Sequence, residues 1–99
     1  MVDANQWRIE MARKLYNRIA VFRKEMGISR QQLGDLIGVN FQTVGYLERE
    51  EYNPSLDLAL RISEVFDLPV ESIFSTKPMK PLRKELAELK MRREINEKI

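Results

Sequence analysis

Apolar residues recur along this 99-residue chain at steps of three and four, which is the period of a helix, and the alternation typical of strands is weak. The first clear stripe consists of Leu15, Ile19 and Phe22. Gly27 follows this stripe and tolerates the left-handed conformation that often ends a helix. We therefore expect a first helix over about residues 15–26.

The next segment carries signals that begin and end a short helix. Ser29 and Gln32 have the spacing of a capping box, in which the hydroxyl accepts a backbone N–H and the glutamine side chain bonds back to the cap. Gly38 is a natural helix end. A second helix is expected between these signals, with three apolar residues facing the core: Leu33, Leu36 and Ile37.

Only a short turn separates this helix from the next one. Asn40 can cap a third helix over about residues 41–49. At about 100° of rotation per residue, Val44 and Leu47 lie together and point at the core. The opposite face of this helix collects five residues, namely Phe41, Gln42, Gly45, Tyr46 and Arg49.

Two further helices follow. Asn53 and Pro54 provide a polar cap and a proline at the first helical position, which predicts the start of a fourth helix. Its stripe consists of Leu56, Ala59, Ile62, Ser63 and Phe66. Pro69, with Ile73 and Phe74 beyond it, predicts a short closing helix. The expected fold is therefore an all-α, five-helix bundle with helical extensions at both ends.

We divide the chain into a bundle over residues 15–75, an N-terminal helical extension over 1–14, a linker over 76–81 and a C-terminal amphipathic helix over 82–99.

The apolar residues of the last helix fall on two nearly opposite sides, with Leu82, Leu86 and Leu89 on one and Met91, Ile95 and Ile99 on the other. They do not form a continuous coiled-coil seam. A solvated helix, a dimerisation arm, a docking surface and a basic DNA contact all remain open.

Charge is distributed unevenly, although the net charge is only +2. Residues 1–30 hold seven basic and three acidic groups, residues 31–75 two and eight, and residues 76–99 eight and four. The local balances are therefore +4, −6 and +4. Basic segments at both ends suit a polyanionic partner, whereas the acidic middle argues against a surface that is coated with DNA throughout.

The composition excludes several kinds of chemistry. The chain contains neither cysteine nor histidine, which excludes disulfides, thiolate or imidazole metal sites and nucleophiles activated by histidine. We expect no enzyme, no catalytic residue, no metal and no cofactor. No signal-peptide core and no run of 18 apolar residues is present, so we expect a cytoplasmic protein without a membrane partner.

Two short helices joined by a glycine turn, within about sixty residues, fit a helix-turn-helix. The stretches MGISRQQLGDLIGVNFQTVGYLE and YNPSLDLALRISEVFDLPVESIF closely resemble the lambda-repressor-like DNA-binding domain of phage Cro and repressor proteins, the xenobiotic-response-element family of regulators. The resemblance covers about residues 17–75. It implies a transcriptional regulator, expected to be a repressor, that binds a pseudo-palindromic operator in double-stranded DNA as a homodimer.

The resemblance also implies that the outward face of the third helix lies in the major groove. Gln42 can form two hydrogen bonds with an adenine edge, and Phe41 can pack on a thymine methyl. Tyr46 can contact a methyl group, a base edge or a phosphate. Gly45 lacks a side chain, which lets the helix backbone approach the bases, although it could also be a tolerated glycine that costs about 1 kcal/mol. We take these four as base-reading residues.

Phosphate contacts are expected mainly from basic side chains around this helix. The resemblance implies that Arg30, at the start of the second helix, is the main candidate, because relatives place a glutamine or similar polar group on the DNA backbone at this position, and the helix N-terminus adds backbone amides there. Arg49 lies on the outward face of the third helix. Asn53 and Arg18 are weaker candidates for a phosphate contact. Asn53 could equally be a helix cap, and Arg18 could simply be exposed to solvent.

The glutamates in and after the third helix fall into two groups. By resemblance, Glu48 forms a structural ion pair with Arg23 near the end of the first helix. Glu50 and Glu51 lie at or beyond the helix end, where many relatives have glycine followed by a basic or polar residue. We therefore expect no phosphate contact from these two positions.

Two other classes of function remain open. A protein-interaction module, such as the antitoxin of a toxin–antitoxin pair, fits the acidic middle, and a protein partner could bind the terminal helices. The register of four residues argues against it, namely Arg30, Gln42, Tyr46 and Arg49. An enzyme that uses Glu50 and Glu51 is the least favoured, because adjacent carboxylates on a loop are usually solvated.

Overall fold

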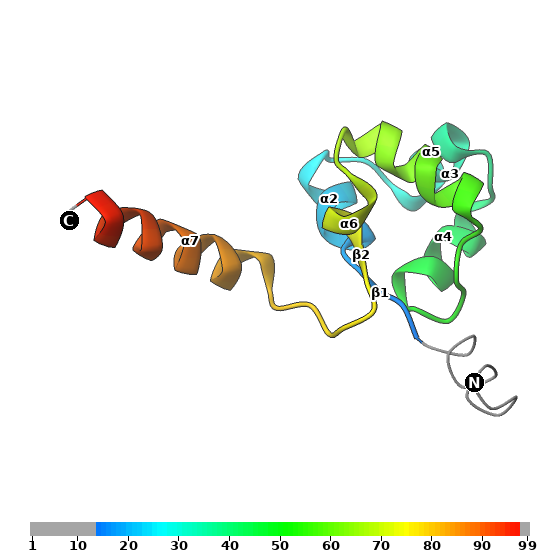
Figure 1. The fold of residues 1–99 in the computed structure, drawn as a ribbon. Coiled ribbons are helices and arrows are strands. Elements are labelled where there is room, and N and C mark those ends of the chain that lie inside the picture. Colours follow the sequence, from blue (N-terminus) through cyan, green and yellow to red (C-terminus); the bar gives the residue numbers. More distant parts are fainter. Residues whose placement is uncertain (1–13, 98–99) are drawn as a thin grey trace, which may run out of the picture.

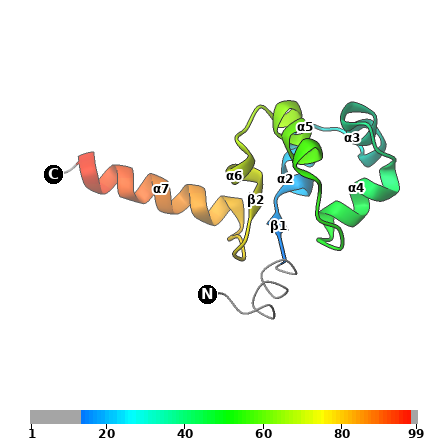
Figure 2. The same ribbon diagram turned by 45° about the vertical axis from the view of Figure 1, so that its right-hand side comes forward.

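The structure, a computed structural model, describes residues 14–97, with side chains as far as Arg93. Five short helices form a bundle, and one longer helix extends from it (Figures 1 and 2). The elements are β1 (Tyr16–Asn17), α2 (Ile19–Glu25), α3 (Arg30–Ile37), α4 (Phe41–Glu48), α5 (Leu56–Phe66), α6 (Val70–Ile73), β2 (Phe74–Ser75) and α7 (Leu82–Glu97). The helical extension predicted over residues 1–14 lies outside the described residues apart from Lys14.

The predicted helical bundle is confirmed, and the structure adds a small two-stranded sheet to it. Strands β1 and β2 pair antiparallel, so the two ends of the bundle meet, and the first helix begins at Ile19 instead of about residue 15. The side-chain oxygen of Asn17 accepts the N–H of Ile19 at 3.0 Å, while its amide donates to the Leu47 carbonyl at 2.7 Å. The strand pairing and the bond to Leu47 are long-range contacts, and they hold Asn17 outside the helix that its neighbours predict.

The local signals for α3 and α4 are confirmed. Ser29 and Gln32 form both hydrogen bonds of a capping box, and Gly38 ends α3 in the left-handed conformation with φ of 81°. The Asn40 side chain accepts the N–H of Thr43 at 2.9 Å, which caps α4. Both helices of the motif therefore begin and end where local chemistry places them.

The predicted start of α5 was wrong. Ser55, not Asn53, caps this helix by accepting the N–H of Leu58 at 3.2 Å. Pro54 consequently precedes the cap instead of occupying the first helical position. This start turns Leu58 toward the core and leaves Leu56, which we expected in the core, largely exposed to solvent.

The core is formed by apolar side chains from all five helices of the bundle and from β2. The buried residues are Ile19, Leu33, Ile37, Val44, Leu47, Leu58, Ala59, Ile62, Ile73 and Phe74. Leu36 was expected among them but is exposed, because the buried face of α3 is centred between Leu33 and Gly34. A Cβ atom at Gly34 would lie 2.5 Å from the backbone oxygen of Val39, so the crossing of α3 and α4 leaves no room for a side chain.

Residues 76–81 connect β2 to α7, which points away from the bundle (Figure 1). Arg18 ties the base of this helix to the bundle by donating to the Lys80 carbonyl at 2.8 Å and by pairing with Glu85. Within the described part of the chain, no helix is both long and apolar enough to cross a bilayer.

Candidate nucleic-acid interface

Helix α4 has one buried face and one exposed face. Val44 and Leu47 are buried in the core. On the outward face, which consists of Phe41, Gln42, Gly45, Tyr46 and Arg49, the side chain of Gln42 is exposed and two aromatic residues are 55% (Phe41) and 48% (Tyr46) exposed. Exposed aromatic side chains that cluster on one short helix commonly mark a contact surface.

Arg49 lies across the outward face and covers its glycine. The guanidinium carbon of Arg49 is 5.2 Å from the centre of the Tyr46 ring, in the range of a cation–π contact. A Cβ atom at Gly45 would lie 3.1 Å from Nη1 of Arg49. Gly45 is therefore buried beneath this guanidinium, which lies close to the position that a Cβ atom would occupy.

This arrangement had a signal in the sequence that we did not use. Gly45 and Arg49 are four residues apart, so they lie on the same side of a helix, one turn apart. A small residue one turn earlier leaves room for a long side chain to lie along the helix. The pattern of a glycine followed four residues later by arginine therefore indicates that Arg49 lies flat along α4.

A buried carboxylate joins three helices of the bundle, namely α2, α3 and α4. Glu48 is only 3% exposed, and its Oε2 accepts from Nε of Arg23 at 2.6 Å. Its Oε1 accepts from Nε of Arg30 at 2.9 Å. The structure thus brings together Arg23 and Glu48, as the resemblance implied, and adds Arg30, which sequence reasoning did not connect to them.

The cluster keeps the Glu48 carboxylate ionised. Burial alone raises the pKa of Glu48, but hydrogen bonds from Arg23 and Arg30, together with their positive charges, outweigh burial and hold this pKa below its ordinary value. Arg23 also donates to the Ile28 carbonyl at 2.9 Å, so its position is set from two sides. Glu48 therefore acts as a fixed negative charge that orients Arg30.

Arg30 is the first residue of α3, and its side chain is 47% exposed although Glu48 binds it. Only its Nε takes part in the bond to Glu48, and within residues 14–97 its two Nη groups form no hydrogen bond. A guanidinium that is held at one end and open at the other can bind an anion without losing much side-chain freedom.

The two weaker phosphate candidates differ in their surroundings. Asn53 is exposed in the loop between α4 and α5, and its side chain forms no hydrogen bond to any described residue. The side chain of Arg18 is 10% exposed and is bound to Glu85 and to the Lys80 carbonyl. Since its guanidinium faces α7, we leave Arg18 out of the DNA contacts proposed below.

The loop after α4 contains a residue in an unfavourable conformation. Glu50 has φ of 62°, which lies in the left-handed region that glycine adopts most easily. The N–H groups of Glu50 and Glu51 bond to carbonyl oxygens of α4 and close the helix. Glu48, Glu50 and Glu51 lie close together in the sequence. Nevertheless, the described residues contain no group of three acidic side chains that could hold a metal ion.

Comparisons with known proteins bear on the same segment. Residues 19–73 match the family described as Helix-turn-helix. An uncharacterized HTH-type transcriptional regulator from Archaeoglobus fulgidus is 40% identical over 57 residues, which is 58% of this chain and 81% of that protein. Repressor protein C of Escherichia phage P2 is 36% identical over 52 residues, which is 52% of this chain and 52% of that protein.

A solved structure agrees with the observed arrangement of helices. The crystal structure of a protein from Bacteroides fragilis aligns with a TM-score of 0.57, covering 62% of this chain and 98% of that chain. The two sequences are 21% identical in this alignment, so the likeness concerns the fold alone.

Proposed function

The chain belongs to the helix-turn-helix family, as its resemblance to phage Cro and repressor proteins predicted, and on this premise we propose that it regulates transcription by binding double-stranded DNA through α4. The outward face of α4 carries this proposal. Its aromatic and amide side chains are exposed on a helix whose other face is locked into the core. A rigid helix of this kind is what the major groove admits.

Base reading is assigned to the side chains that project from the outward face. Gln42 would form two hydrogen bonds with an adenine edge, and Phe41 would pack on a thymine methyl. Tyr46 lies beside them and would contact a methyl group or a base edge. Gly45 contributes indirectly, because its missing side chain lets Arg49 lie along the helix.

Phosphate binding is assigned to Arg30, Arg49 and Asn53. The open side of the Arg30 guanidinium supports this role, and so does its place at the N-terminus of α3, where backbone N–H groups favour an anion. Arg49 is half-exposed and is also paired with Glu51 at 3.3 Å, so a phosphate would have to replace a weak surface pair.

We further propose that the protein is a repressor and acts as a homodimer in the cytoplasm. The similarity to repressor protein C of phage P2 supports the first point. A two-fold dimer would place two α4 helices on one face of the duplex, one helical turn of about 34 Å or a multiple of it apart. Its operator would then be pseudo-palindromic.

Selection from a pool of random duplexes tests the proposal. The wild-type chain should enrich one motif at moderate salt. Gln42→Ala should relax the preference at one base position, whereas Gln31→Ala, an exposed glutamine on α3, should leave the motif unchanged. Failure of a folded protein to enrich any motif would favour the protein-interaction module that the acidic middle also fits.

Salt dependence separates the two kinds of contact. Arg30→Ala should weaken binding to all sequences alike and reduce the slope of log K against log salt by about one. Lys77→Ala removes the same charge from the linker and should leave this slope nearly unchanged. An equal effect of both variants would indicate that Arg30 contributes only through the net charge.

A further inference from the structure

The two arginines assigned to phosphate binding are each held by a glutamate through a single nitrogen. Nε of Arg30 donates to Glu48 at 2.9 Å, and Nε of Arg49 donates to Glu51 at 3.3 Å. Both arginine side chains remain about half-exposed. The two glutamates differ sharply, because the side chain of Glu48 is 3% exposed and that of Glu51 is 54% exposed. The two ion pairs should therefore respond differently to an approaching polyanion.

Burial keeps Glu48 away from DNA. Its carboxylate is bonded to Arg23 as well as to Arg30, so its charge is balanced inside the protein. Among the described residues, the side chain of Glu51 pairs with Arg49 alone. The Glu51 carboxylate is exposed to the same solvent as the Arg49 guanidinium. A phosphate that binds Arg49 must therefore displace Glu51 or approach it against electrostatic repulsion.

The backbone places Glu51 next to Arg49. Glu50 adopts its left-handed conformation, with φ of 62°, at the end of α4. The N–H of Glu51 then bonds back to the Tyr46 carbonyl at 3.0 Å. The guanidinium of Arg49 is in turn restrained by the Tyr46 ring, 5.2 Å away. Since both partners are held near each other, their pairing costs less side-chain freedom than that of two unrestrained surface residues.

Resting on the assignment of Arg49 to phosphate binding, we propose that Glu51 competes with DNA phosphate for Arg49 and thereby limits the affinity of α4 for DNA. In the free protein, Glu51 neutralises Arg49. In the complex, the guanidinium of Arg49 transfers to a phosphate oxygen and Glu51 loses its partner. This exchange opposes binding to every duplex alike, because phosphate contacts carry no sequence information. Glu51 therefore sets the strength of binding but not the base preference.

A double-mutant cycle tests the competition. Fluorescence anisotropy with the selected operator and with a scrambled duplex compares four full-length proteins: the wild type, Glu51→Gln, Arg49→Ala and the double variant. At low salt, Glu51→Gln should raise the affinity for both duplexes about threefold, within the range of an exposed ion pair. In the Arg49→Ala background the same change should raise affinity at most about 1.5-fold, because the competition needs both residues.

Salt dependence gives a second readout of the same exchange. In the wild type, Glu51 attracts a cation when Arg49 leaves it, which offsets the cation that the phosphate releases. Glu51→Gln removes this offset, so the slope of log K against log salt should become steeper by up to about one. The threefold gain in affinity should shrink as salt rises, since exposed charges are screened. The motif selected from random duplexes should stay the same.

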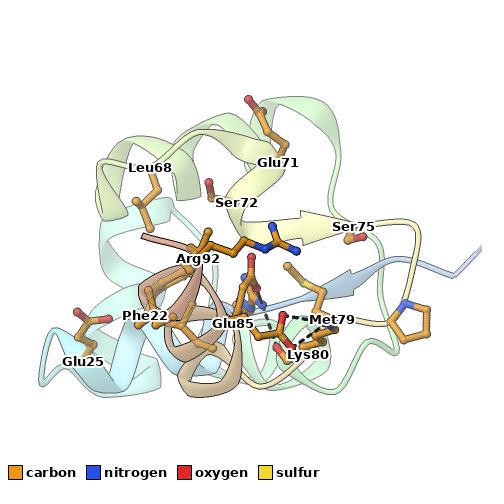
Figure 3. A pocket seen from close by; sticks show the side chains of 16 residues that line it. Phe22, Glu25, Leu68, Glu71, Ser72, Ser75, Met79, Lys80, Glu85 and Arg92 are labelled. Atoms are coloured by element: carbon orange, nitrogen blue, oxygen red, sulfur yellow. Dashed lines mark hydrogen bonds and ion pairs between the residues drawn. The ribbon is translucent and has the colours of Figure 1, made fainter. Parts of the chain in front are cut away.

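Glu71→Gln is the matched control for net charge. Glu71 is exposed on α6 and lines the cleft between α7 and the bundle (Figure 3). Helix α6 lies on the side of the bundle near α7, away from α4 (Figures 1 and 2). The substitution removes the same charge as Glu51→Gln but should leave DNA affinity and the salt slope nearly unchanged. Circular dichroism verifies that each variant keeps its helices.

The outcomes separate this inference from the proposed function. Unchanged or lower affinity in Glu51→Gln overturns the competition, and so does an equal gain in the Arg49→Ala background or from Glu71→Gln. In each of these cases DNA binding itself stands. If the folded wild type and all variants bind neither duplex, the DNA-binding role is overturned together with the competition.

Discussion

The two faces of α4 differ in how far their side chains are buried in the protein and bonded to its other residues. On the inner face, Val44 and Leu47 are buried and Glu48 is bound by two arginines. On the outward face, Phe41 and Gln42 are exposed, and the Gln42 amide forms no hydrogen bond to any described side chain or backbone group. One face therefore holds the helix in place, while the other remains available for a partner.

This difference predicts that the two faces can be altered separately. Substitutions on the inner face should lower the free energy of unfolding, and substitutions on the outward face should change DNA binding at nearly constant stability. A substitution that changed both quantities strongly would break the distinction.

The largest effect is expected from Glu48→Gln. Neutralising Glu48 leaves Arg23 largely buried without a counter-charge, which should lower the free energy of unfolding by about 3 kcal/mol. Urea unfolding followed by circular dichroism measures this change. Glu51→Gln is the matched control, because its exposed pair with Arg49 should contribute less than about 1 kcal/mol. Equal losses in both variants would show that the cluster adds nothing to an ordinary surface pair.

The next largest loss of stability is expected from Gly34→Ala. The added methyl group would meet the backbone oxygen of Val39 at 2.5 Å, and backbone cannot move aside as a flexible side chain can. Overpacking of this kind should lower the free energy of unfolding by about 2 kcal/mol. An unchanged thermal midpoint would mean that α3 and α4 separate easily.

Tyr46→Ala should act on DNA binding alone. The Tyr46 ring is half-exposed and contacts Arg49, so its removal should weaken operator binding about tenfold, equivalent to about 1.4 kcal/mol. Fluorescence anisotropy with the selected operator measures this change. The thermal midpoint should move by less than about 3 °C. A large drop in the midpoint would place Tyr46 with the inner face.

Gly45→Ala should have the opposite sign from Gly34→Ala. A methyl group at Gly45 meets only the flexible end of Arg49 at 3.1 Å, and alanine favours the helix by up to about 1 kcal/mol. We therefore expect a small gain in stability together with weaker DNA binding, because the guanidinium of Arg49 is displaced. Unchanged DNA binding would show that the position of Arg49 is unimportant.

The smallest effect is expected from pH. Because the pKa of Glu48 is lower in the folded state, its contribution to stability is full above the ordinary glutamate pKa of about 4.3 and is lost as pH falls through the folded pKa. The difference in unfolding free energy between wild type and Glu48→Gln should thus shrink below about pH 4. A constant difference down to pH 3 would contradict this role.

Local signals in the sequence predicted the motif well. Three local features depend on residues only a few positions apart: the capping box at Ser29, the cap at Asn40 and the left-handed end at Gly38. They can therefore be predicted without knowledge of the fold. The buried pair on α4, Val44 and Leu47, follows from helical periodicity in the same way. These features fit a helix-turn-helix, and the resemblance to phage Cro and repressor proteins identified it.

Long-range contacts were not predictable in this way. The sequence around Asn17 favours a helix, yet β1 pairs with a strand almost sixty residues later. Arg18 could be read as solvated or as a phosphate ligand until the fold placed it against Glu85. The bond between Arg30 and Glu48 likewise depends on how α3 crosses α4.

The sequence by itself determined the helix-turn-helix and the outward face of α4, because capping and periodicity are local properties of the chain. Only the tertiary structure decided which charged groups are engaged and which are free, since a charged side chain takes its role from the partner that folding brings within reach. Arg18 is bound to α7, whereas Arg30 is held by Glu48 with its outer side open to a phosphate.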